Sequence, residues 1–240
     1  METSNERLSL TPNENFYKDG AEYWSKIPPT VDGMLGGFSE ISTTDIHSSK
    51  TLLKQLFTST KQPLGRGYAL DCGAGIGRIT KFLLSDLFDR VDMVEQNPQF
   101  LESAKKYLGK TILEKKIGQM FPVGLQDFRP EPGKYDVIWC QWVLGHLTDE
   151  DFVAFFERCK LGIKPKGVII VKENISSGQV EVDTTDSSVT RPMGLLRELF
   201  DKAGLDCCRM VKQLGFPKGL FTVYMFVLRP RHEENVGSGE

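Results

Sequence analysis

A chain of 240 residues with 40% apolar and 26% charged residues has the size and composition of one large folded domain, which excludes a disordered, collagen-like or coiled-coil chain. The 30 basic and 32 acidic residues give a formal net charge of −2, so no overall basic field attracts nucleic acid. No apolar run is long enough to span a membrane, and residues 1–15 lack the pattern of a secretory signal. The 5 cysteines include no Cys-x-x-Cys pair and favour neither a disulfide framework nor a zinc site. We therefore expect a protein of the nucleus or cytoplasm that is not secreted and binds no metal, membrane or nucleic acid.

The N-terminal quarter is predicted to be helical. Residues 1–14 are poor in apolar side chains and are expected to form a loose tail, as are residues 231–240. A helix over residues 16–27 ends at two prolines, and a glycine-rich loop follows it. A second helix then carries an apolar face, with Ser48 or Ser49 as its N-cap.

From Tyr68 onward, short apolar strands alternate with amphipathic helices. Strands are predicted at residues 68–71, 91–95, 120–123, 135–140, 167–172, 206–211 and 221–228. Helices are predicted after the first strand (Ile79 to Leu87), from Pro98 to Leu108, and over residues 149–161 and 193–203. This alternation predicts an α/β fold with a doubly wound, mostly parallel sheet of seven strands. The last two strands should pair antiparallel, because the loop between them is too short for a crossover helix.

The sharpest local signal is a glycine loop. Residues 70–78 read Leu-Asp-Cys-Gly-Ala-Gly-Ile-Gly-Arg and lie between a predicted strand and a predicted helix. Glycines at this place allow a tight turn and a close approach of the backbone to a ligand. Glu95 ends the next strand about twenty residues later, at the spacing that suits an acid holding ribose hydroxyls. A purely structural turn is the less favoured interpretation.

The spacing of the glycines indicates which nucleotide is bound. A nicotinamide or flavin fingerprint is Gly-x-Gly-x-x-Gly, whereas this loop is Gly-x-Gly-x-Gly preceded by Asp71, so no pyrophosphate is implied. The loop resembles the first motif of the S-adenosyl-L-methionine (AdoMet)-dependent methyltransferases. In that family the strand-end acid and the loop backbone receive the amino-acid part of the cofactor, and the next acid holds the ribose. By this resemblance Arg78 meets the cofactor carboxylate; the alternative is a solvated arginine on the helix surface.

A narrower resemblance rests on four blocks of sequence. They are residues 27–37 (Ile-Pro-Pro-Thr-Val-Asp-Gly-Met-Leu-Gly-Gly), 69–80, 136–149 and 186–191. Together they resemble the protein α-N-terminal methyltransferases, which act on proteins that begin Xaa-Pro-Lys or Xaa-Pro-Arg after removal of methionine. The resemblance covers Phe16 to Leu228. It implies a helical lid and substrate channel over residues 15–60 and an AdoMet-binding core over residues 61–230.

The same resemblance assigns roles to individual residues. It implies that Leu125 and Gln126 contact the cofactor around its adenine. It implies further cofactor contacts for Gly73, Gly75, Arg78, Glu95, Gln96, Asn97 and Gln141. It implies contacts to the substrate N-terminus for Trp24, Leu35, Ile41, Trp142, Asn174, Asp183, Asp186, Ser188 and Phe221. His146 and Asp186 would flank the α-amine as catalytic residues, while Asp183, Asp186 and Ser188 would receive the basic third residue. The product would carry up to two or three methyl groups, and S-adenosyl-L-homocysteine would be released.

Two positions depart from the family pattern. The family has an aspartate where this chain has Glu95, so the reach of the carboxylate differs by one methylene. The family has a tyrosine where this chain aligns Phe221, which puts a hydroxyl contact to the substrate in doubt.

The expected chemistry needs only a modest base. Methyl transfer from a sulfonium requires a free lone pair on the attacking nitrogen, and an α-amine has a pKa of about 8. His146, with an ordinary pKa of about 6.5, suits proton removal, and Asp186 either accepts the proton or orients the imidazole. No metal is required.

Each of these residues also has a purely structural interpretation. His146 precedes Thr148, a good N-cap with Asp151 three residues later, and so could simply finish a turn. Asp183 and Asp186 could be solvated loop residues, and the tryptophans could belong to the core.

Three other functions stay open beside the α-N-methyltransferase. They are a small-molecule N- or O-methyltransferase of the same fold, a module that binds N-terminal peptides without turnover, and, least favoured, a nicotinamide oxidoreductase. The oligomeric state and the physiological targets are not indicated by the sequence.

Overall fold

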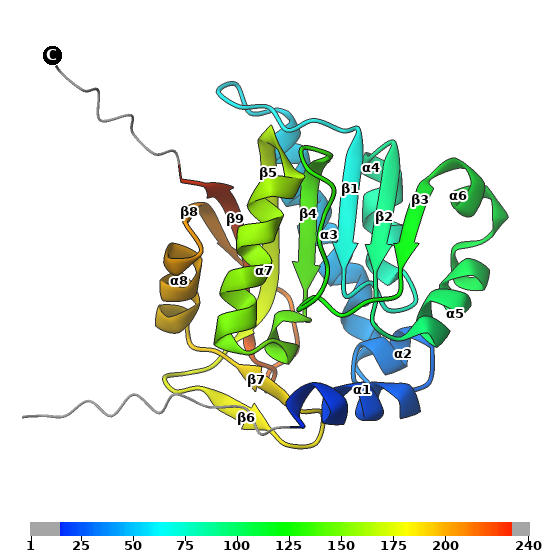
Figure 1. Ribbon diagram of the computed structural model, residues 1–240, viewed down its shortest axis with the longest axis vertical. Helices are drawn as coiled ribbons and strands as arrows, with labels where there is room; N and C mark the ends of the chain where they lie inside the picture. The colour runs from blue at the N-terminus through cyan, green and yellow to red at the C-terminus, as the bar shows by residue number, and fades with distance from the viewer. Residues whose placement is uncertain (1–14, 232–240) are drawn as a thin grey trace, which may run out of the picture.

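The computed structural model describes residues 15–231 (Figure 1), so the tails predicted over residues 1–14 and 232–240 lie outside the described residues. Arg231, expected to begin the C-terminal tail, instead pairs with Asp201 at 2.6 Å and with Asp206 at 3.0 Å. No helix within residues 15–231 is long and apolar enough to cross a membrane.

A seven-stranded sheet organises the chain in the order β3-β2-β1-β4-β5-β9-β8. Its strands are β1 (Tyr68–Cys72), β2 (Arg90–Val94), β3 (Ile117–Phe121), β4 (Tyr135–Gln141), β5 (Ile163–Ile175), β8 (Leu205–Lys212) and β9 (Thr222–Pro230). Neighbours among β1 to β5 pair in parallel, and β9 is antiparallel to both β5 and β8. The predicted mostly parallel, doubly wound sheet and its antiparallel last pair are confirmed.

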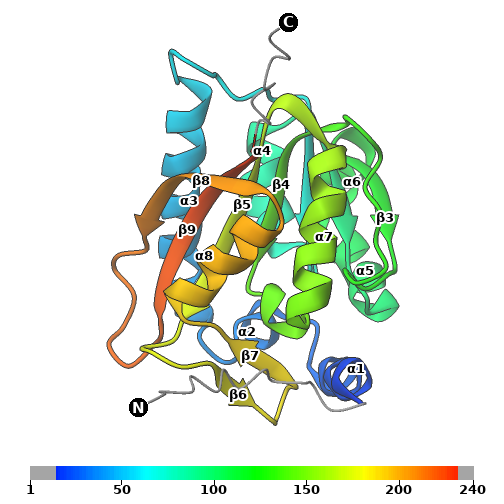
Figure 2. The ribbon, with the colours of Figure 1, turned by 60° about the vertical axis from the view of Figure 1, so that its left-hand side comes forward.

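Helices cover both faces of this sheet (Figures 1 and 2). On one face lie α7 (Asp149–Gly162) and α8 (Met193–Lys202), and on the other lie α3 (Ser42–Phe57), η2 (Thr80–Leu84), α4 (Ser85–Leu87) and α5 (Pro98–Leu108). Every residue of β4 is buried, which explains why its middle, residues 137–140, is a continuous apolar run rather than an alternating one. Phe152 and Phe156 pack on the first face, and Leu53 and Leu83 on the second.

The elements that follow the parallel strands gather at one edge of the sheet. There the N-terminal helices α1 (Phe16–Lys26) and α2 (Val31–Met34) lie across the carboxyl ends of the strands, beside the hairpin of β6 (Glu181–Asp183) and β7 (Ser188–Thr190) (Figure 1). Two short 3-10 turns, η1 (Ser39–Ile41) and η3 (Leu144–His146), complete this edge. Ligands of open α/β sheets bind at such an edge, because the loops there are free to contact them.

Several boundaries differ from the sequence prediction. The cap at Ser48 or Ser49 is wrong: α3 begins at Ser42, directly after η1, and Ser49 lies inside it with its hydroxyl bonded to the Asp45 carbonyl. The third strand begins at Ile117 instead of Met120, and β5 runs from Ile163 to Ile175.

Several local elements had no counterpart in the prediction. They are the short helices α2 and α6 (Lys110–Lys115), the 3-10 turns η1 and η3, the β6–β7 hairpin and the π-helical geometry of η2. The π-helical turn shifts the phase of its side chains, so Phe82 is 44% exposed. The hairpin is short, with β6 exposed and β7 half-buried, and its Ser/Thr-rich sequence resembles an ordinary loop.

Candidate active site

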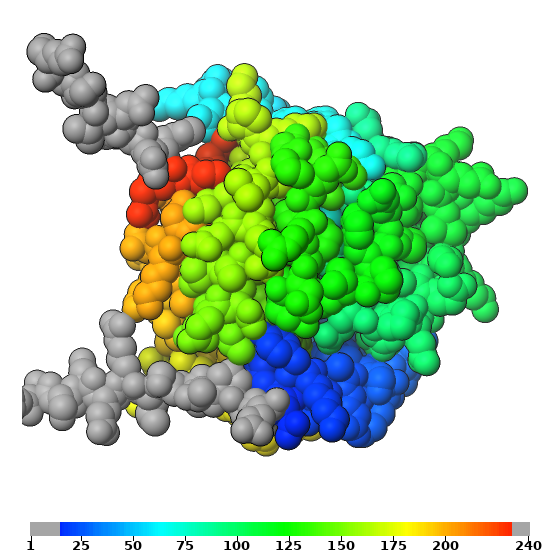
Figure 3. Space-filling view, viewed as in Figure 1, coloured from blue at the N-terminus to red at the C-terminus, as the bar shows by residue number. Residues whose placement is uncertain are grey.

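Two neighbouring cavities lie at the carboxyl edge of the sheet and have lining residues in common. The glycine-loop cavity lies over β1, β2 and β4, and the hairpin cavity lies between η1, β7 and the loop before β9. Their shared walls are Trp24, Met34, Trp142 and His146. The N-terminal helices cover this edge from outside, as the blue surface in Figure 3 shows.

Glycine is required at two positions of the loop that follows β1. Gly73 and Gly75 have φ angles of 68° and 55°, which side chains adopt rarely. A Cβ on Gly73 would lie 2.4 Å from Val143, and one on Gly75 would lie 2.5 Å from the Met34 sulfur. The bare backbone of this loop therefore forms the floor of the glycine-loop cavity.

Glu95 lies at the end of β2 and faces this loop. Its two carboxylate oxygens accept the backbone N–H groups of Gly75 at 2.9 Å and Asn97 at 2.8 Å, and burial raises its pKa. The extra methylene relative to aspartate thus brings the carboxylate to the glycine loop. Gln96 also lines the cavity, whereas Asn97 does not; its side chain caps α5 by accepting the Gln99 N–H at 2.9 Å. A cofactor contact from Asn97 stays a prediction.

The far wall of the glycine-loop cavity is mostly apolar. Leu125 and Gln126 line it as the sequence suggested, together with Phe100 and Val123. Arg158, which the sequence did not single out, holds this wall by donating to the carbonyls of Leu125, Gln126 and Phe128 at 2.8–2.9 Å.

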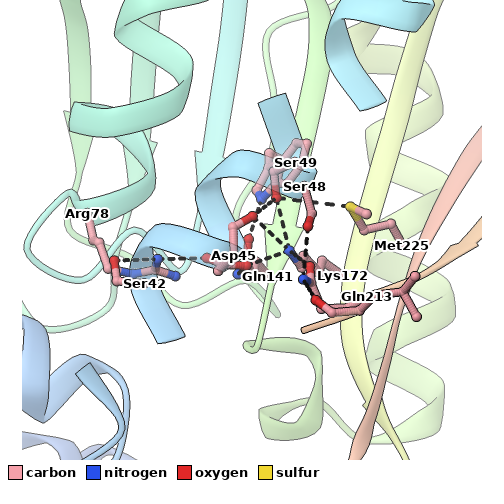
Figure 4. Close-up of polar contacts among 11 residues, drawn as sticks. Ser42, Asp45, Ser48, Ser49, Arg78, Gln141, Lys172, Gln213 and Met225 are labelled. Atoms are coloured by element: carbon pink, nitrogen blue, oxygen red, sulfur yellow. Dashed lines mark hydrogen bonds and ion pairs between the residues drawn. The ribbon is translucent and has the colours of Figure 1, made fainter. Parts of the chain in front are cut away.

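Arg78 and Gln141 form the third side of this cavity. Arg78 is only 5% exposed, so the interpretation of a solvated surface arginine is wrong. Its Nη1 lies 2.7 Å from the Asp45 carboxylate, and the Gln141 amide donates to the same carboxylate at 2.8 Å (Figure 4). Asp71, the expected partner of the cofactor amino acid, does not line the cavity; it accepts the Thr80 hydroxyl at 2.6 Å, and burial raises its pKa to about 7.

The hairpin cavity contains most of the residues expected to meet a substrate. Leu35, Ile41, Asn174, Asp186, Ser188 and Phe221 all line it. Ser188 donates its hydroxyl to Asp186 at 2.6 Å, which orients that carboxylate. Phe221 is 41% exposed at the cavity mouth. Asp183 is exposed, does not line the cavity and accepts the Thr185 N–H, so its substrate contact stays a prediction.

His146 stands between the two cavities as a neutral imidazole. Its Nδ1 lies 3.3 Å from the Ser187 carbonyl oxygen, so this nitrogen carries the proton, and its Nε2 accepts the Trp24 indole N–H at 3.0 Å. Burial lowers the pKa of His146, and the nearby Asp186 charge opposes that shift. Thr148 does cap α7, accepting the Asp151 N–H at 3.0 Å, so the turn function and the site function coexist.

Two further buried residues support the turn that carries His146. One oxygen of Glu173 accepts the N–H groups of Val143 and Leu144 at 2.9 Å each. Arg191 donates to the carbonyls of Leu144 at 2.9 Å and Leu147 at 2.6 Å. The sequence shows Glu173 only as an acid next to Asn174, directly after a predicted strand. An acid in that position does not indicate that it supports a turn elsewhere in the chain. Among residues 15–231, no group of three acidic, histidine or cysteine side chains is placed to hold a metal.

Comparisons with known proteins agree with this geometry. Residues 12–229 match the family described as AdoMet-dependent proline di-methyltransferases. The chain is 49% identical to N-terminal Xaa-Pro-Lys N-methyltransferase 1-B of Xenopus laevis over 89% of this chain and 95% of the relative, and 47% identical to N-terminal Xaa-Pro-Lys N-methyltransferase 1 of Homo sapiens over 92% and 98%. A solved SAM-dependent methyltransferase from Leishmania major superposes with a TM-score of 0.84 at 36% identity, covering 91% of this chain and 85% of that one. The chain therefore belongs to the AdoMet-dependent proline di-methyltransferase family.

Proposed function

We propose that this protein transfers methyl groups from AdoMet to the α-amine of proteins that begin Xaa-Pro-Lys or Xaa-Pro-Arg after removal of methionine, up to di- or trimethylation. The observation that carries the proposal is the shared wall of the two cavities, made by Trp24, Met34, Trp142 and His146. A donor in the glycine-loop cavity and an amine in the hairpin cavity would meet at this wall. The names of the relatives support the same acceptor.

The glycine-loop cavity fits AdoMet by the chemistry of its walls. At Gly73 and Gly75 a Cβ would collide with Val143 and with Met34, so only bare backbone can line the cavity there. Glu95 offers carboxylate oxygens to ribose hydroxyls, and the apolar wall at Leu125 suits an adenine. Arg78 offers its guanidinium to a carboxylate. When bound, AdoMet supplies an electrophilic methyl group, and the chain supplies position and a proton acceptor.

The residues at the shared wall are suited to handle the amine proton. His146 is neutral because burial lowers its pKa, so its Nε2 lone pair is available at neutral pH once the Trp24 N–H moves aside. Asp186 lines the same cavity and attracts the ammonium form of the incoming α-amine. Much of the rate should come from holding the amine in line with the methyl group in a site that excludes water.

The hairpin cavity suits a proline followed by a basic residue. Leu35, Ile41 and Trp142 provide apolar walls, and proline loses little entropy on entering such a channel because its φ is already fixed. Asp186 provides a carboxylate for lysine or arginine, and the Asn174 amide can bond the peptide backbone.

Mass spectrometry of a free Xaa-Pro-Lys peptide incubated with the protein and AdoMet tests the proposal, beside the same peptide with an acetylated N-terminus. Methyl groups on the free peptide alone are expected, and their number gives the product state. Methylation of the acetylated peptide would place the acceptor on a side chain. Cofactor binding without methylation of either peptide would favour the small-molecule methyltransferase or the binding module. The nucleus or cytoplasm remains the proposed compartment.

A further inference from the structure

A buried polar network lies behind the glycine-loop cavity, with Asp45 of helix α3 at its centre (Figure 4). Asp45 is 0% exposed and binds two cations: one oxygen lies 2.5 Å from the Lys172 Nζ and the other lies 2.7 Å from the Arg78 Nη1. The Gln141 amide also donates to Asp45, at 2.8 Å. A single carboxylate from the N-terminal extension therefore orients both Arg78 and Gln141, which line the cavity.

The hydrogen bonds of Lys172 indicate that it is charged. It is 0% exposed, and its Nζ lies within 3.1 Å of four acceptors: the Asp45 carboxylate and carbonyl, the Ser49 hydroxyl and the Gln213 side-chain oxygen. Burial lowers the pKa of Lys172, but four oxygens around one nitrogen match an ammonium with three donors and leave no role for a lone pair.

The contacting charges do not balance. Arg78 and Lys172 contribute two positive charges, and Asp45 contributes one negative charge, so the contacting trio carries a surplus of one positive charge in a water-poor environment. Two other acids lie near Arg78, and neither bonds it. Asp71 accepts the Thr80 hydroxyl, and burial raises its pKa to about 7. Glu95 lines the same cavity as Arg78, but its two carboxylate oxygens accept the backbone N–H groups of Gly75 and Asn97. A buried uncompensated charge is costly unless a ligand supplies its partner.

The surplus is directed into the glycine-loop cavity. Lys172 is enclosed by protein oxygens, whereas Arg78 lines the cavity. The hydrogen bonds that Arg78 makes with described residues, to Asp45 and Ser42, both use Nη1, which leaves Nη2 for a ligand. The guanidinium also stands 5.6 Å from the ring centroid of Trp142, which limits where it can turn.

We infer that Lys172 and Asp45 are positioning residues. Their buried charges neutralise each other and leave the positive charge of Arg78 without a protein partner, so that the cavity selects a cofactor bearing a carboxylate. Lys172 neutralises Asp45 and thereby frees the Arg78 charge for the ligand, although Lys172 itself does not reach the cavity. The inference rests on the proposed function for the identity of the cofactor, and it adds the reason why an uncharged analogue would be rejected.

Calorimetric titration of the full chain, without any peptide, tests this inference. The two ligands are S-adenosylhomocysteine and its decarboxylated form, which keeps the adenosine, thioether and amine. The wild type should prefer the carboxylate ligand by about a hundredfold, as a charge-assisted contact to a partly buried arginine suggests. Lys172→Met should reduce that preference to about tenfold, by weakening S-adenosylhomocysteine and leaving the decarboxylated ligand unchanged.

The matched control is Lys50→Met, which removes the same charge from the chain at a more exposed lysine of α3 that pairs with Asp86. It should leave the preference at the wild-type value. Lys172→Gln, which keeps a hydrogen-bonding group for Ser49 and Gln213, is the second neutral variant if the methionine variant does not fold. Equal weakening of both ligands in either variant would show a merely structural role and overturn the inference. So would a wild type that binds the two ligands alike, whether or not the variants fold.

This experiment can fail or succeed independently of the proposed methyltransferase function. Binding is measured without an acceptor, so a chain that methylates no peptide still reports on the carboxylate preference. Conversely, methylated peptides with no carboxylate preference would support the function and refute the role of Lys172.

Discussion

The Trp24 indole Nε1 donates a hydrogen bond of 3.0 Å to the His146 Nε2, although 122 residues separate them in sequence. The two rings meet edge to face, with their centroids 5.8 Å apart. The other imidazole nitrogen faces the Ser187 carbonyl, so both contacts select one neutral tautomer. The N-terminal helix α1 thus sets the state of the proposed base, and Nε2 can accept an amine proton only when the indole N–H leaves it.

Replacing Trp24 by phenylalanine should raise the pKa of His146 by about half a unit to one unit. The lost indole donor no longer stabilises the neutral imidazole, and the added space admits water. Titration of the His146 ring signals by NMR measures the shift. Trp142→Phe is the control, because the Trp142 indole nitrogen makes no hydrogen bond with a described residue. A fall in the His146 pKa in Trp24→Phe would contradict the assigned tautomer.

The Asp186→Asn variant should move the acid limb of the pH–rate profile to lower pH. His146 accepts a proton only when it is unprotonated, so the rate falls as the pH drops through its pKa, which burial holds below the ordinary value of 6.5. The Asp186 charge opposes that lowering, and its removal lets the pKa fall further. Measurement of kcat against pH with a Xaa-Pro-Lys peptide follows the limb.

Asp183→Asn provides the comparison for this profile, since Asp183 is exposed and outside the hairpin cavity. Its acid limb should coincide with that of the wild type. An Asp186→Asn limb at higher pH than the wild type would argue against His146 as the group that titrates.

Glu173→Gln should flatten the pH dependence of stability between about pH 4.5 and 7. Burial raises the folded-state pKa of Glu173 from 4.5 to about 7, so between these values the folded chain holds a proton that the unfolded chain has released. Stability therefore falls as the pH rises through this window, by an amount on the order of 3 kcal/mol for a shift of this size. Glutamine has no proton to lose.

Urea unfolding at several pH values measures this effect. The slope should diminish in Glu173→Gln without vanishing, because the pKa of Asp71 is also raised to about 7. Glu157→Gln, at an exposed position of α7, should keep the wild-type slope. An unchanged slope in Glu173→Gln would mean that Glu173 is ionised in the folded chain throughout this range.

Arg191→Lys should destabilise the fold by about 1–3 kcal/mol and lower kcat. Three nitrogens of Arg191 reach the Asp149 carboxylate and the carbonyls of Leu144 and Leu147, a fork that lysine cannot reproduce. The turn that carries His146 would lose two of its supports. Chemical denaturation and peptide kinetics report the two effects.

Arg231→Lys is the matched control for this change. Arg231 likewise contacts more than one acceptor, the carboxylates of Asp201 and Asp206, but it lies at the surface, where such pairs contribute little. Equal destabilisation by the two variants would contradict the prediction, because it would show that the buried contacts of Arg191 stabilise the fold no more than exposed ones do.

The architecture and the cofactor side of the site could be predicted from the order of residues along the chain. Alternating strands and helices predicted the doubly wound sheet, and the short connection before the last strand predicted its antiparallel pairing. The glycine loop and the acid at the end of β2 placed Gly73, Gly75 and Glu95 on one cavity. These features can be predicted from sequence because the periodicity of side chains and the backbone freedom of glycine depend only on a few neighbouring residues.

The meetings of polar groups that lie far apart in sequence could not be predicted in this way. Asp45 and Lys172 lie 127 residues apart, and neither stands out in its own segment, yet together they carry the buried charge behind Arg78. The same holds for Trp24 with His146, and for the start of α3 at Ser42. A buried charge or donor must find a partner somewhere, but sequence spacing does not say where, because that choice depends on how helices and strands pack around it.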